Sequence, residues 1–68
     1  MAISKVLAQN LKSYRTNKDL TQEELALKCN LSRTYISDLE WEKRNISIGN
    51  LEKIANALNI TPYLLVKE

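Results

Sequence analysis

Residues 21–45 read TQEELALKCNLSRTYISDLEWEKRN, and their pattern predicts two short helices joined by a tight turn. Thr21 followed three residues later by Glu24 has the form of a capping box, in which each side chain accepts a hydrogen bond from the other residue's backbone N–H. Ser32 is placed to cap the second helix. Asn30 suits the turn because asparagine tolerates the left-handed conformation that often ends a helix.

Apolar residues in this stretch recur three or four positions apart, so each helix has one face to bury. They are Leu25, Ala26 and Cys29 in the first helix and Ile36 and Leu39 in the second, with apolar Leu31 in the turn between them. The second helix keeps polar side chains on its other face, near its beginning. A helix in the DNA major groove reads base edges with that end, so the pattern favours a DNA-binding helix-turn-helix.

The run T-Q-E-E-L-A followed by L-S-R-T-Y-I-S-D-L-E resembles the helix-turn-helix of phage repressors. R-T-Y-I-S and R-N-I-S resemble more closely the controller proteins of restriction–modification systems, and the likeness covers roughly residues 7–65. It implies an all-α, five-helix, repressor-like helix-turn-helix DNA-binding domain. By this resemblance the protein is a homodimeric transcription regulator.

Length and composition set limits on the function. Sixty-eight residues predict one domain over 1–68, with the motif at about 21–41 and a dimerisation segment at about 58–68. The net charge of +2 is weak evidence for nucleic acid, so the placement of charge carries the argument. No apolar run predicts a membrane span or a signal peptide. The single cysteine suits a reducing cytoplasm.

Catalysis and metal binding are not expected. With one cysteine and no histidine, neither a metal site nor a nucleophile–histidine pair can be assembled, and no cofactor is predicted.

The flanking segments also predict helices. Ser4 is expected to cap the first helix, and Ser47 the fourth. The fourth helix is expected to bury a stripe of Ile48, Leu51, Ile54, Ala55 and Leu58. A short last helix is expected to follow, with Thr61 as its cap and Pro62 at its first position.

Candidate DNA contacts follow from the motif and from the resemblance: Gln22, Ser32, Arg33, Thr34, Tyr35, Ser37, Trp41, Lys43, Arg44 and Asn45. Arg33 can bind guanine O6 and N7 with two parallel hydrogen bonds, whereas its alternative is a solvated surface role. Tyr35 is assigned to the DNA, with packing in the core as the alternative. Trp41 stands where the family often has an arginine, and both a backbone contact and a core or interface role remain open.

In repressor-type proteins an arginine late in the first helix pairs with a glutamate that ends the recognition helix. By this resemblance, Arg15 and Glu40 form a structural ion pair. The alternative is two separate solvated side chains.

The end of the chain predicts a partner surface. Four consecutive apolar residues at 63–66 are too many for one face of a short helix, so a twofold homodimer is expected. Its interface residues are Ile46, Ile60, Tyr63, Leu64 and Val66. Packing within one chain is the alternative. A symmetric dimer implies a near-palindromic double-stranded operator.

The resemblance implies control of the protein's own promoter. RNA polymerase is a further candidate partner, and Glu23 and Glu24 are candidate contacts to it. A phage-type repressor and an antitoxin-like protein-interaction module are the competing interpretations.

Overall fold

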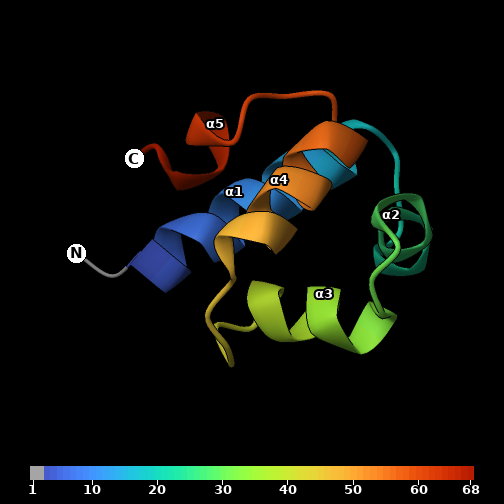
Figure 1. The fold of residues 1–68 in the computed structure, drawn as a ribbon, viewed down its shortest axis with the longest axis horizontal. Coiled ribbons are helices and arrows are strands. Elements are labelled where there is room, and N and C mark those ends of the chain that lie inside the picture. Colours follow the sequence, from blue (N-terminus) through green and yellow to red (C-terminus); the bar gives the residue numbers. More distant parts are fainter. Residues whose placement is uncertain (1–2) are drawn as a thin grey trace.

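Five helices form the computed structural model, which describes residues 3–68. They are α1 (Ile3–Asn17), α2 (Gln22–Cys29), α3 (Arg33–Glu40), α4 (Ile48–Ala57) and α5 (Tyr63–Val66). The helix α1 packs against α3 and α5, while α2 packs against α3 and α4. The helix α3 therefore lies along one edge of the molecule, and α5 lies at the opposite edge (Figure 1). No helix within residues 3–68 has the length and hydropathy needed to cross a bilayer.

Local capping explains where the central helices begin and end. The predicted capping box is confirmed: the Thr21 hydroxyl accepts from the Glu24 N–H at 3.0 Å, and Glu24 Oε1 accepts from the Thr21 N–H at 2.9 Å. The turn at Asn30 is also confirmed, with φ of 59° in the left-handed region. Ser47 opens α4 by accepting from the Asn50 N–H at 3.1 Å. These bonds satisfy backbone groups that a helix end leaves without partners.

One apolar core joins all five helices. Its fully buried members are Leu7, Leu11, Leu25, Ile36, Leu39, Ile54, Leu58 and Leu65. Ala26 and Cys29 are buried beside them, as the spacing within the motif predicts. The core fixes the inner face of α3 and leaves its outer face free for another role.

Three expectations about helix ends and faces are wrong. The helix α1 begins at Ile3, so Ser4 lies inside the helix and does not cap it. Ile48 is 80% exposed, because it is the first residue of α4 and lies outside the buried stripe that begins a turn later. The helix α5 has no side-chain cap bond; the Thr61 carbonyl accepts from the Leu64 N–H at 3.1 Å instead.

A single amide fastens α5 to α1. The side chain of Asn10 donates to the carbonyl of Leu65 at 3.0 Å and to that of Lys67 at 2.8 Å. Together with buried Leu65, these bonds place a helix of only four residues firmly on the first helix.

Candidate nucleic-acid interface

The helix α3 presents a polar surface because its ends are fixed and one face is buried. Ser32 has extended backbone and accepts from the Tyr35 N–H at 3.0 Å, which starts the helix. Ile36 and Leu39 are buried beneath it. Arg33 and Thr34, in the first turn, are exposed. This is the end of a helix that reaches base edges when the helix lies in a major groove.

An ion pair fixes the other end of α3 against two other helices. Arg15 of α1 binds Glu40 with two hydrogen bonds, Nε to Oε2 at 2.7 Å and Nη2 to Oε1 at 3.0 Å. Gln22 of α2 also donates to Glu40 Oε1, at 3.0 Å, and Arg15 Nη1 donates to the Leu20 carbonyl at 2.7 Å. The side chains of Arg15 and Glu40 are only 11% and 4% exposed.

This network sets the angle of α3 relative to α1 and α2. Paired planar groups allow little rotation, because both hydrogen bonds of the arginine fork must keep their geometry. By resemblance, Gln22 is a candidate contact to the DNA backbone. Its side-chain amide nitrogen, however, donates its hydrogen bond to Glu40. The inward bond of Gln22 has no signal in the local sequence, since its partner is 18 residues away.

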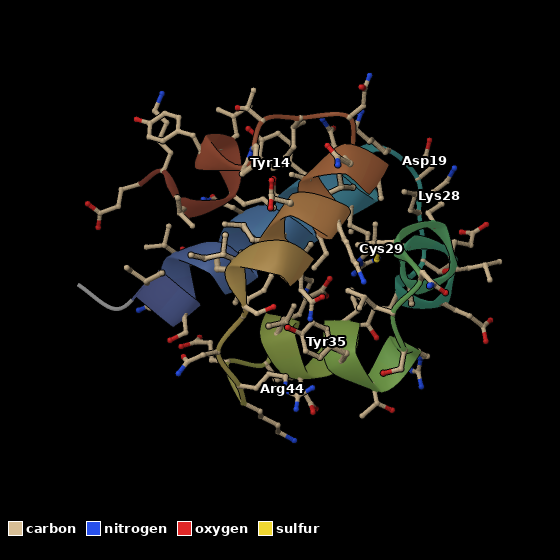
Figure 2. The ribbon with its side chains drawn as sticks, in the orientation of Figure 1. Tyr14, Asp19, Lys28, Cys29, Tyr35 and Arg44 are labelled. Atoms are coloured by element: carbon tan, nitrogen blue, oxygen red, sulfur yellow. The ribbon has the colours of Figure 1, made fainter. Side chains whose placement is uncertain are left out.

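The loop after α3 returns to the helix through a cation–aromatic contact. The guanidinium carbon of Arg44 lies 4.6 Å from the centre of the Tyr35 ring. Figure 2 shows the two side chains near each other beside α3, and Tyr35 is also partly buried against the core. Such a contact stabilises by about 0.5–1 kcal/mol at an exposed site. It orders Arg44 beside the helix that carries Arg33, and sequence reasoning did not anticipate it.

The structure places most candidate DNA contacts in the region of α3 and the loop that follows it. Those with exposed positions are Ser32, Arg33, Thr34, Trp41, Lys43, Arg44 and Asn45, while Gln22, Tyr35 and Ser37 are partly buried. Trp41, at 70% exposure, lies outside the core of this chain. Glu42 adopts φ of 60° in the loop, a left-handed conformation unusual for glutamate.

The candidate dimer residues lie in α5 and in the loops that precede α4 and α5. Tyr63 is 63% exposed, and Ile46, Ile60, Leu64 and Val66 are partly buried. Leu65 alone in α5 is fully buried. One residue of α5 therefore anchors the helix, and its neighbours retain apolar surface.

Two ionisable groups have shifted pKa values with clear causes. The hydrogen bond from the Thr21 backbone lowers the pKa of the Glu24 carboxyl group, so its charge supports the beginning of α2. Burial raises the pKa of the Cys29 thiol, which makes it a poor nucleophile. Among residues 3–68, no three His, Cys, Asp or Glu side chains come together to hold a metal ion.

Comparison with known proteins gives the family. Residues 11–65 match the profile of a family described as helix-turn-helix. A hypothetical transcription factor of Neisseria meningitidis is 48% identical over 61 residues, which are 90% of this chain and 58% of that protein. The chain thus spans less than two thirds of that relative's length.

Solved structures agree with the arrangement of the helices. The restriction–modification controller protein C.AhdI from Aeromonas hydrophila is 40% identical with a TM-score of 0.89, covering 91% of this chain and 94% of that one. SinR, a master regulator for biofilm formation solved in complex with DNA, is 32% identical with a TM-score of 0.86, covering 90% and 98%. The expected all-α, five-helix architecture is confirmed, and so is the resemblance to controller proteins. The chain belongs to the helix-turn-helix family and is homologous to restriction–modification controller proteins.

Proposed function

We propose that this protein is a sequence-specific DNA-binding transcription regulator that acts as a homodimer on a near-palindromic operator at its own promoter. The observation that carries the proposal is the exposed polar first turn of α3, on a helix whose far end is fixed by Arg15, Glu40 and Gln22. A helix fixed in this way loses little conformational freedom on binding, so more of the contact energy contributes to affinity.

Sequence selection comes from the first turn of α3. Arg33 bonds guanine O6 and N7, a pairing that discriminates by about 1–3 kcal/mol against another base. Thr34 and Ser37 reach neighbouring base edges or phosphates. Tyr35, covered by Arg44 on one face, contributes through the shape of the DNA at deformable steps.

Affinity comes mainly from the phosphate backbone. Lys43, Arg44 and Asn45 are exposed in the loop that leaves α3, and they bind phosphates on either side of the groove. Each neutralised phosphate releases a condensed counterion, so binding weakens as salt rises. Placement of charge thereby compensates for a net charge of only +2.

Dimerisation supplies the operator geometry. Tyr63, Leu64 and Val66 of α5, with Ile46 and Ile60, provide the self-complementary apolar surface that a twofold interface requires. A symmetric dimer presents its two α3 helices to successive major grooves, about 34 Å apart. Dimerisation that depends on protein concentration then acts as the switch. Exposed Glu23 and Glu24 provide an acidic surface for RNA polymerase. The protein acts in the cytoplasm as a regulator and catalyses no reaction.

A fluorescence-anisotropy titration tests the proposal. Wild type and Arg33→Ala are titrated on labelled DNA from upstream of the protein's own gene and on a random duplex, at two salt concentrations. Lys53→Ala, an exposed cation on α4, is the matched control. We expect Arg33→Ala to lose about 1–3 kcal/mol of specific affinity for each half-site and to keep its salt-sensitive binding to the random duplex.

The same titration separates the alternatives. Wild-type binding no stronger to the upstream DNA than to the random duplex would overturn control of its own promoter. Specific binding that Arg33→Ala and Lys53→Ala weaken equally would overturn the role of α3. Footprint spacing of one helical turn between half-sites supports the dimer, and a single half-site footprint contradicts it.

A further inference from the structure

A cleft lies where α1, α2 and α3 meet, next to the Arg15–Glu40 ion pair. Lys12, Arg15, Gln22, Glu40 and Trp41 line it, and its volume is about 200 Å³. The cleft has room for ordered water or for a small polar group with part of its hydration shell. Lys12 and Trp41 form the exposed rim.

The cleft carries an uncompensated positive charge. Its only carboxylate is that of Glu40, which already accepts from Arg15 and Gln22. Within residues 3–68, no carboxylate lies within ion-pairing distance of the Lys12 ammonium. The lining therefore has one free cation, at the rim, and an anionic group is the ligand that such a site attracts.

Trp41 gives the rim a second property. Its side chain is 70% exposed, although tryptophan is usually well buried. The indole combines a flat apolar surface with one N–H donor. A DNA backbone matches both features, because the deoxyribose is largely apolar and the adjoining phosphate accepts hydrogen bonds.

We propose that this cleft is a phosphodiester-binding subsite, in which the Lys12 ammonium and the Trp41 indole N–H bind one backbone phosphate beside the bases that α3 reads. The inference rests on the proposed DNA-binding function and extends the interface to α1. The Lys12 ammonium is a compact charge on a flexible side chain, so it can follow the position of the phosphate. Gln22 only lines the cleft, because its amide nitrogen is hydrogen-bonded to Glu40. The contact carries no base preference and adds affinity to every sequence.

The salt dependence of binding tests Lys12. Each phosphate contact contributes about 0.9 to the magnitude of the slope of log K against log[salt]. Loss of the contact from both protomers of a dimer therefore reduces the magnitude of the slope by about 1.8. We expect this change for Lys12→Gln on both the upstream DNA and the random duplex. Lys12→Arg keeps the charge and should keep the slope, and Lys53→Gln on α4 is the control for loss of one exposed charge.

Trp41 supplies an independent measurement because it is the only tryptophan in the chain. Acrylamide should quench its fluorescence efficiently in the free protein and much less in the DNA complex. A complex in which Trp41 stays fully accessible, or in which Lys12→Gln keeps the wild-type slope, overturns the subsite even if Arg33→Ala still loses specificity. If the wild type binds no duplex at all, the proposed function and the subsite both fail.

Discussion

Replacing Arg15 with methionine tests the idea that the ion pair fixes α3. The substitution removes two of the three hydrogen bonds that Glu40 accepts and leaves a carboxylate of 4% exposure with Gln22 alone. Breaking one side of a buried pair costs about 3–5 kcal/mol, because the remaining charge stays uncompensated. Loss of the bond from Arg15 to the Leu20 carbonyl adds to this cost.

That loss is large for a small domain. At about 0.05–0.15 kcal/mol per residue, a chain of this length unfolds with a free energy of about 3–10 kcal/mol. Urea denaturation followed by circular dichroism, at neutral pH and 25 °C, should therefore show the free energy of unfolding of Arg15→Met lowered by about 3–5 kcal/mol, with a correspondingly lower urea midpoint. Lys18→Met, an exposed cation beyond the same helix, should change the free energy of unfolding by less than about 0.5 kcal/mol.

The double variant distinguishes the cost of an unpaired buried charge from the loss of the ion pair itself. Arg15→Met with Glu40→Met leaves no buried charge, and replacing both partners with apolar groups is often neutral. We expect it to be more stable than either single variant by at least about 1 kcal/mol, which a double-mutant cycle measures. A cost below about 1 kcal/mol for Arg15→Met alone, or simple additivity in the cycle, would refute the reasoning.

Three further substitutions test local features. Glu42→Gly should raise the free energy of unfolding by about 0.5–1 kcal/mol because glycine adopts φ of 60° without strain, and Glu42→Ala should bring no comparable gain in the same urea titration. Gly49→Ala should stabilise by about 0.5–1 kcal/mol, since an added Cβ meets no atom within 4 Å, and a lower urea midpoint would contradict this. The folded protein lowers the pKa of the Glu24 carboxyl group, so the ionised group stabilises the fold at pH values above the pKa that Glu24 has in the unfolded chain. This contribution is lost as the pH falls through the pKa that Glu24 has in the folded protein. Between about pH 5 and pH 3, wild type should therefore lose more stability than Glu24→Gln, and parallel pH profiles would disprove the assignment.

Features set by neighbouring residues could be predicted from the sequence. The bonds of Thr21 with Glu24, of Ser32 with Tyr35 and of Ser47 with Asn50 each join residues three positions apart, so a motif of fixed spacing reveals them. The turn at Asn30 follows from the conformational tolerance of one residue type. Burial within the motif follows from the helical period.

Features that join distant residues could not be predicted in this way. The bond from Gln22 to Glu40 and the contact of Arg44 with Tyr35 depend on how helices pack, and no periodicity encodes them. The exposure of Ile48 has the same origin, because a residue at a helix end is buried only if another element covers it. The cleft beside Lys12 appears only once α1, α2 and α3 are placed together.

The hydrogen bonds of Asn10 have a consequence for synthesis of the chain on the ribosome. Asn10 binds the carbonyl of Leu65, a residue translated 55 positions later. Until that segment has emerged, the side of α1 that α5 covers stays open to solvent, although every residue of the α2–α3 unit is already available. The nascent chain can therefore pack α1 to α4 against one another first, but α5 covers its side of α1 only after residues 63–66 have been made.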